Sequence, residues 1–264
     1  TVYSRILKKL YPNTPLLLGG VEASLRRVTH YDYWDDKLHP TILADARADL
    51  LIYGMGELPL KQVVRELREG KNFREMVNIP QTAFLRPTHD IPENRFGEEV
   101  LLFSHEECLA DKRKQAANFR VVEEQSNRLK AARILQGVGQ ETIVINPPYP
   151  PMTEEEMDAS FDLPYTRLPH PKYKGKQIPA YEAIKFSVTL HRGCFGGCAF
   201  CTISAHQGKF ITSRSKRSVL QEVRKITQMA DFKGYISDLG GPSANMYRMR
   251  GKNPSACATC QKPS

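Results

Sequence analysis

Three cysteines lie within eight residues of this chain, in the run Cys194-Phe-Gly-Gly-Cys198-Ala-Phe-Cys201. Thiolates are soft ligands that select iron–sulfur clusters or zinc. A structural zinc site usually has four ligands in paired Cys-x-x-Cys arms, and a four-cysteine cluster closes its last iron with another cysteine. Three thiolates with this spacing therefore predict a 4Fe–4S cluster in which one iron has no protein ligand and is open to a small molecule.

The spacing Cys-x3-Cys-x-Phe-Cys resembles the signature of the radical S-adenosylmethionine (SAM) superfamily. Longer stretches resemble one family within it, the YgiQ-type family of uncharacterised radical SAM proteins. The stretches that carry this resemblance are residues 31–36 (YDYWDD), 48–57, 145–158, 162–171, 186–208, 213–215 and 237–247. They are spread along the chain, so the resemblance covers most of it.

This resemblance implies a radical SAM enzyme. In such an enzyme SAM chelates the open iron through its amino and carboxylate groups. One electron from the reduced cluster then cleaves SAM to methionine and a 5′-deoxyadenosyl radical, which abstracts a hydrogen atom from a substrate. The cofactors supply the difficult chemistry, and the protein positions them and excludes water. A reducing electron-transfer protein is the expected partner, whereas the sequence identifies neither the substrate nor a catalytic residue.

The same resemblance suggests which residues contact SAM. Phe200, the aromatic residue before the last cysteine, is expected near the bound adenine. Gly240 and Gly241 stand where related enzymes have a glycine-rich strand end that receives the SAM amino group, and a bare backbone allows close approach there. A plain strand-to-loop turn is the alternative for the glycine pair. His191 and Arg192 either offset the charge of the cluster or simply pack within the loop.

Two other classes of protein stay open at this point. The net charge of +9 and the two groups of cysteines are compatible with a zinc-binding, nucleic-acid-associated module. No recognised nucleic-acid-binding motif accompanies the charge, so a nucleic-acid partner rests on charge alone. The other alternative is a non-catalytic iron–sulfur electron carrier, but such carriers usually close the fourth iron with a fourth protein ligand.

The three remaining cysteines carry less information. Cys257-Ala-Thr-Cys260 is half of a ligand set, and it is compatible with a metal site completed elsewhere, a redox pair or incidental thiols. Cys108 stands alone, and an isolated cysteine is usually a small hydrophobic residue. Metal-type spacing rather than a disulfide framework predicts a reducing, cytoplasmic location. The chain has no apolar run of 18 or more residues, so we expect no transmembrane helix and no membrane partner.

The pattern of apolar residues predicts an α/β fold in three parts. Residues 1–75 are predicted to form the C-terminal part of a doubly wound, flavodoxin-like domain. Short apolar runs that end in glycine are typical of buried parallel strands, and they occur at 16–20 and 49–56. Helices are expected at 2–10 and 59–70, where apolar residues recur with helical spacing.

This first part resembles the cobalamin-binding-like domain that precedes many radical SAM barrels. The sequence Tyr53-Gly-Met-Gly-Glu57 is similar to a glycine-rich turn of those domains. The histidine motif that ligates cobalt is not in this chain, so the sequence does not support cobalamin as its cofactor. The aromatic patch His30–Trp34 is expected either to cover a loop or to line the edge of the sheet.

Residues 76–180 are predicted to be a connector, and residues 181–264 are predicted to be the start of a radical SAM barrel. In the connector we expect strands at 100–103 and 141–146 and one long polar helix over 106–136. The predicted helix has a rough apolar stripe made of Phe119, Val122, Leu129, Ala132 and Leu135.

The barrel part is predicted to begin with a strand at 184–190 that leads into the cysteines. Ser218-x-x-Gln221 resembles the capping box of a helix start, which Ser213-Arg214-Ser215 is expected to help fix. A second strand is expected at 234–239, so strand, loop, helix and strand would form the first βα units of a partial barrel. Only 63 residues follow Cys201, and we therefore expect the chain to be an internal piece of a longer protein.

Overall fold

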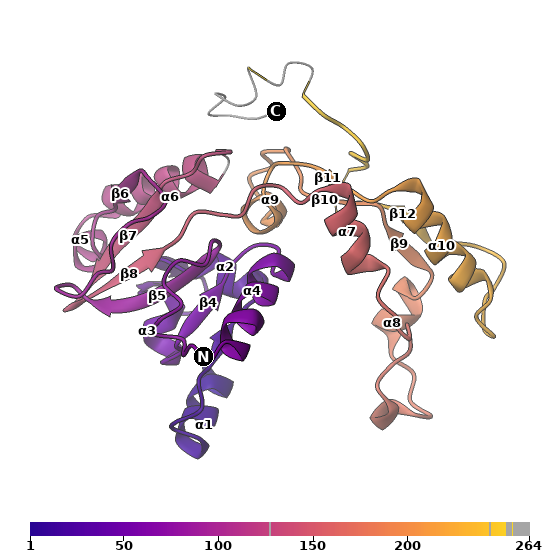
Figure 1. Cartoon of the computed structure of the whole chain (residues 1–264), viewed down its shortest axis with the longest axis horizontal. Helices are drawn as coiled ribbons and strands as arrows, with labels where there is room; N and C mark the ends of the chain where they lie inside the picture. The colour runs from indigo at the N-terminus through magenta and orange to yellow at the C-terminus, as the bar shows by residue number, and fades with distance from the viewer. Residues whose placement is uncertain (127, 243, 252–254, 256–264) are drawn as a thin grey trace. The chain divides into compact units, whose positions relative to one another are not determined.

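The computed structural model of the chain describes residues 1–126, 128–242, 244–251 and 255. Its internal contacts divide the chain into two compact units. Of the described residues, unit 1 contains 1–126, 128–150, 205–208 and 255, and unit 2 contains 151–204, 209–242 and 244–251. Figure 1 shows the course of the chain through the helices and strands of each unit. None of the helices in the described part of the chain is long and apolar enough to cross a membrane.

Unit 1 contains six helices and eight strands among its residues 1–126 and 128–150. In chain order they are α1 (Val2–Leu10), β1 (Leu17–Leu18), α2 (Val21–Leu25), β2 (His30–Asp32), β3 (Lys37–His39), α3 (Ile42–Ala46), β4 (Leu50–Ile52), α4 (Glu57–Arg68), β5 (Thr82–Pro87), β6 (Glu99–Leu101), α5 (His105–Ala110), α6 (Lys112–Ser126), β7 (Arg133–Val138) and β8 (Glu141–Ile145). Helices α1 and α4 confirm the two helices that the sequence predicts in its first part.

The centre of unit 1 is a six-stranded sheet with the order β1-β4-β5-β8-β7-β6. The predicted α/β class is confirmed, and the two strands expected in residues 1–75 form the parallel pair β1–β4. Strands β6 and β7 are also parallel, whereas β4, β5, β8 and β7 pair with one another in antiparallel fashion. The sheet is mixed because a short turn at Gly139, with a φ of 61°, joins β7 directly to β8, and such turns connect antiparallel strands.

Two apolar clusters cover the two faces of this sheet, because successive side chains of a strand point to opposite faces. Leu51 and Ile143 pack with side chains of α2, α3 and α6 on one face. Leu50 and Val144 pack with α4 and with residues 73–79 on the other face. Burial on both faces explains why the strand sequences are continuously apolar rather than alternating.

The prediction of a single long helix over residues 106–136 is wrong. The chain instead forms α5, breaks at Asp111, which has an extended backbone, continues as α6 and then enters strand β7. Ile134 and Leu135 belong to opposite apolar clusters, so burial on both faces of the sheet determines a strand at this place. Much of the segment predicted as a connector therefore belongs to the same sheet as residues 1–75.

Unit 2 is smaller and has shorter strands. Its elements in chain order are α7 (Glu154–Phe161), the 3-10 helix η1 (Pro171–Tyr173), α8 (Pro179–Ile184), β9 (Ser187–Thr189), β10 (His191–Arg192), β11 (Thr212–Ser213), α10 (Lys216–Thr227) and β12 (Asp238–Gly240). Helix α9 (Ile203–Gln207) crosses the boundary between the two units at residue 205.

The core of unit 2 is the parallel pair of strands β9 and β12, with α10 between them in the sequence. The predicted order of strand, loop, helix and strand is confirmed. Helix α10 begins earlier than Ser218, because Ser215 is its N-cap and accepts a hydrogen bond from the Ser218 backbone N–H at 3.1 Å. Phe186 and Phe232 pack edge to face beneath this helix at a ring distance of 5.4 Å.

The buried amide of Asn146 provides a test of the unit 1 core. Its Nδ2 donates hydrogen bonds to Val77 O at 3.0 Å and Ile79 O at 2.8 Å, and it lies 3.2 Å from Thr82 Oγ1. Asn146→Ala removes these hydrogen bonds, and only Ile79 O keeps another donor, the Thr82 hydroxyl at 2.7 Å. We therefore expect the free energy of unfolding of unit 1 to fall by about 2 kcal/mol. Urea unfolding measures the loss, and Asn13→Ala, a change at an exposed turn residue, is the control. Equal effects of the two substitutions would contradict this account of the core.

Candidate functional site

The three clustered cysteines lie on a loop whose base is fixed by hydrogen bonds. We define the cysteine loop as residues 193–204, which follow β10 directly. Strand β10 pairs in antiparallel fashion with β11, so His191 lies opposite Ser213 and Arg192 opposite Thr212. The Leu190 N–H donates to Gly240 O at 2.7 Å, which ties the start of β10 to the end of β12. The loop is therefore held at the carboxyl end of the parallel pair of strands.

Two of the three thiols gather around Gly196. A Cβ atom on Gly196 would lie 3.3 Å from Cys194 Sγ and 3.8 Å from Cys198 Sγ, so both sulfur atoms lie close to this backbone position. Cys194 is buried, with 7% of its surface exposed. Cys201 is half-buried, and its N–H donates to Cys198 O at 3.0 Å in a tight turn.

The residues present fit an iron–sulfur cluster in their chemistry. Three thiols are the ligands that such a cluster requires, and Gly196 keeps open the space between two of them that a side chain would fill. Gly193 has a φ of 85°, which turns the backbone sharply just before Cys194. No group of three or more His, Cys, Asp or Glu side chains in the described residues is gathered tightly enough to hold a metal ion. The structure brings Cys194 and Cys198 together and does not gather the third thiol with them.

The other cysteines are not part of this arrangement. Cys108 is fully buried in unit 1, where Asn118 Nδ2 donates to its sulfur at 3.2 Å. Burial raises the pKa of the Cys108 thiol, which keeps it protonated and unreactive. Cys257 and Cys260 lie outside the described residues.

The glycine pair at the end of β12 has two different surroundings. The atoms nearest to a Cβ on Gly240 would be the two oxygens of the Asp238 carboxylate, at 3.1 Å and 3.3 Å, and that side chain is able to rotate away. A Cβ on Gly241 would lie 1.9 Å from His191 Nε2, so the imidazole ring occupies the place of any side chain there. The absence of a side chain at Gly241 thus has a packing reason that the sequence did not reveal.

His191 is a structural group of the loop base. It is fully buried, and its Nε2 accepts a hydrogen bond from the Met246 N–H at 3.0 Å. Burial lowers the pKa of His191, which favours the neutral imidazole that can accept this bond. Of the two roles expected for His191, the structure supports packing at the base of the loop rather than a positive charge that offsets a cluster. Arg192 stacks its guanidinium on the Phe161 ring at 4.9 Å.

Phe200 is the most accessible aromatic residue of the cysteine loop. Its side chain is 90% exposed and lies between Cys198 and Cys201 in the sequence. An exposed ring of this size is costly to leave in water, and it is available to stack on a planar ligand.

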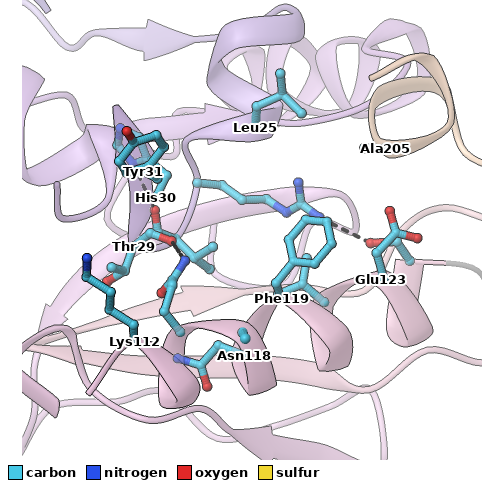
Figure 2. A pocket seen from close by; sticks show the side chains of 15 residues that line it. Leu25, Thr29, His30, Tyr31, Lys112, Asn118, Phe119, Glu123 and Ala205 are labelled. Carbon is cyan, nitrogen blue, oxygen red and sulfur yellow. Dashed lines mark hydrogen bonds between the residues drawn. The ribbon is translucent and has the colours of Figure 1, made fainter. Parts of the chain in front are cut away.

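Unit 1 contains a separate cavity of about 470 Å³. Figure 2 shows Phe119 and Asn118 of α6 on one wall and His30 and Tyr31 on the other. The aromatic patch predicted at His30–Trp34 therefore contributes to this cavity with its first two residues, whereas Trp34 is 86% exposed. None of the cysteines lines the cavity in the described part of the chain.

The chain thus combines a mixed α/β unit with a βα unit that carries a loop with three cysteines. These features are compatible with the radical SAM class that the sequence predicts. The family model described as radical SAM N-terminal matches residues 1–187, and the chain belongs to this family. The match ends just before the cysteine loop. The resemblance to the YgiQ-type family is confirmed by relatives that align over the whole chain.

Three of these relatives are UPF0313 proteins from different bacteria. The protein of Bacteroides thetaiotaomicron is 60% identical over 275 residues, that of Porphyromonas gingivalis 64% over 263 residues, and that of Geobacter sulfurreducens 45% over 263 residues. Each alignment covers 100% of this chain and 44%, 41% and 43% of the relative, respectively. The chain therefore spans less than half the length of the relatives that it matches.

The close approach of His191 to Gly241 predicts different tolerances in the glycine pair. Gly241→Ala should lower the free energy of unfolding of unit 2 by about 2 kcal/mol, since the new methyl group must displace a buried ring. Gly240→Ala is the matched control and should have a much smaller effect. Thermal unfolding of the two variants compares them, and equal losses would show that His191 does not set the constraint.

The neutral state of His191 predicts a pH dependence. Its pKa is lowered in the folded state, so the unfolded chain binds the proton first as the pH falls through about 6.5, the ordinary value. The contribution of neutral His191 to the free energy of unfolding is therefore present above this pH and is lost below it. His191→Gln should flatten the decline in the free energy of unfolding between pH 8 and pH 5.5, whereas His89→Gln, at an exposed position, should not. Urea unfolding at several pH values measures both slopes, and parallel slopes for the wild type and His191→Gln would contradict the assignment.

Proposed function

We propose that this chain carries the cluster-binding part of a radical SAM enzyme. Cys194, Cys198 and Cys201 bind a 4Fe–4S cluster, and the iron without a protein ligand binds SAM. The observation that carries the proposal is the approach of Cys194 and Cys198 to the bare backbone of Gly196, on a loop held at the carboxyl end of β9 and β12. Ligands of α/β folds bind at that end of the strands. Membership of the radical SAM N-terminal family supports the same class of enzyme.

The residues of the loop base position the cluster ligands. Cys194 is fixed most firmly, because it is buried and lies two residues after the β10–β11 pair. Cys198 and Cys201 share a turn and are more exposed, so they adjust to bind a second and a third iron. When bound, the cluster and SAM together supply the one-electron cleavage of SAM.

Gly240 and Phe200 are proposed to contact SAM. The Gly240 carbonyl oxygen already accepts one hydrogen bond, from the Leu190 N–H, and a carbonyl oxygen has a second lone pair for an ammonium group. Gly241 contributes indirectly, because it allows His191 to pack against the strand end. The exposed ring of Phe200 is placed to stack on the adenine.

A reducing electron-transfer protein is proposed as the partner. Helix α10 exposes Lys216, Arg224 and Lys225, whereas its acidic residue Glu222 is turned inward and paired with arginine. A positively charged surface of this kind attracts an acidic protein and speeds its association at low salt.

The cluster ligands are tested by anaerobic reconstitution of the purified chain. We expect about four iron and four sulfide per chain, as one open cubane requires. Cys194→Ala, Cys198→Ala and Cys201→Ala should each abolish the brown colour, whereas Cys108→Ala should retain it. A full cluster in any of the three loop variants would overturn the ligand assignment. A colourless protein that holds zinc would instead support the zinc-binding alternative.

The open iron is tested by adding SAM to the reduced protein and recording the EPR spectrum. We expect SAM to change the signal of the cluster, and Gly240→Val to weaken SAM binding at least about tenfold because a branched side chain blocks the approach to the strand end. The iron content of Gly240→Val should equal that of the wild type, which separates SAM binding from cluster loss. A spectrum that SAM leaves unchanged would indicate an electron carrier with no open iron.

A further inference from the structure

Arg214 is the largest side chain that is fully buried in the described residues. It follows β11 directly and precedes Ser215, the N-cap of α10. A buried guanidinium is costly unless it is paired and hydrogen-bonded. Its position therefore requires an explanation that the proposed cluster ligands do not provide.

The main chain of Arg214 closes the base of the cysteine loop. Its N–H donates to Leu190 O at 3.0 Å, and its carbonyl oxygen accepts from the Tyr247 hydroxyl at 3.0 Å. Leu190 is the last residue before β10, and Arg214 is the first residue after β11. The chain thus leaves the parallel strands at Leu190 and returns to them at Arg214, with all three loop cysteines in between.

The side chain of Arg214 fixes the same base from a second direction. One guanidinium nitrogen donates to Thr189 O at 2.9 Å and also pairs with Glu222. The other two nitrogens donate to Ser218 Oγ, Nε at 3.1 Å and the terminal nitrogen at 2.8 Å. The guanidinium carbon lies 4.5 Å from the centre of the Phe161 ring. One planar group therefore joins the end of β9 to two consecutive turns of α10.

Glu222 links this contact to a second arginine. The carboxylate also pairs with Arg167, whose guanidinium donates to Lys185 O at 2.9 Å and Ser187 O at 2.8 Å on the way into β9. Two cations and one anion are thus buried or half-buried around one strand. Buried ion pairs add little net stability compared with apolar residues of similar size. The network therefore matters mainly because it fixes the relative positions of β9 and α10.

We propose that Arg214 is the positioning residue of the cysteine loop. Its main chain and side chain together hold the carbonyl groups of Thr189 and Leu190, and this fixes the distance and direction from which the loop starts and ends. The inference rests on the proposed function, because a cluster with three protein ligands needs those ligands at fixed separations. Lysine does not replace arginine here, since an ammonium lacks the planar fork that reaches Thr189, Ser218 and Glu222 at once.

The alternative is that Arg214 stabilises unit 2 as a whole and has no particular effect on the loop. The two roles differ in where the structure loosens when the network is removed. The double variant Arg214→Met with Glu222→Gln removes the fully buried cation together with its anion, while the half-buried Arg167 keeps its hydrogen bonds to Lys185 O and Ser187 O. Replacing a buried ion pair with uncharged side chains is often neutral for stability. A positioning role predicts that only the loop loosens in this variant, whereas a general role predicts either no change or loosening throughout unit 2.

The experiment uses the reduced, cluster-free chain, so it does not depend on cofactor loading. Alkylation of each cysteine by iodoacetamide is followed by mass spectrometry, together with amide hydrogen exchange of residues 193–204 and 223–227. In Arg214→Lys and in the double variant we expect Cys194 to react at least about tenfold faster, because this buried thiol is reached only when the loop opens, and opening is easier without the hydrogen bonds of a charged group. Exchange should rise in the loop and stay unchanged in residues 223–227 of α10. Cys108 and the variant Arg224→Gln, which changes an exposed residue of the same helix, are the controls.

An unchanged reaction rate of Cys194, or an equal rise of exchange in the loop and in residues 223–227, would overturn the positioning role. Iron and sulfide content of the reconstituted wild type separates this outcome from failure of the proposed function. A wild type without a cluster, together with a loop that loosens in the variants, would refute the cluster and leave the role of Arg214 in holding the loop. A wild type with a full cluster and a loop that stays rigid in the variants would refute the positioning role alone.

Discussion

Closure of a loop at its base is the constraint on which the site in unit 2 depends. The chain leaves the parallel strands at Leu190 and returns at Arg214, and hydrogen bonds from Arg214 to Thr189 O and Leu190 O join these two points. The pairing of β10 with β11 and the packing of His191 against Gly241 add to the same closure. Fixing the two ends of the segment lowers the conformational entropy that it has to lose when it binds a ligand.

The arrangement separates buried supporting groups from exposed side chains. Buried groups such as Arg214 and His191 hold the base, while Cys198 and Phe200 remain exposed on the loop. Sites supported by well-packed elements are more precise than sites on unsupported loops. Unit 1 is built differently: its mixed sheet is covered on both faces by apolar clusters. None of the loop cysteines lines its cavity beside α6.

The sequence predicted the parts of this structure that depend on local pattern. The α/β class, the strands β1 and β4 and the order of strand, loop, helix and strand around the cysteines follow from apolar runs and glycine positions. The helix predicted over 106–136 failed because Leu129, Ala132 and Leu135 have helical spacing, while burial in the sheet decides that Leu135 lies in a strand. The contacts of Arg214 and His191 join residues up to 55 positions apart, and no local pattern reveals such long-range pairs.

The central claim is that three thiolates of this loop hold a cluster whose fourth iron binds SAM. Electron–nuclear double resonance on the reduced, reconstituted chain with SAM labelled by ¹⁵N at its amino group or ¹⁷O at its carboxylate tests it most directly. The account predicts hyperfine coupling between the cluster and both labels, because both groups are bound to the open iron. A chain that holds a complete 4Fe–4S cluster and shows coupling to neither label would contradict it.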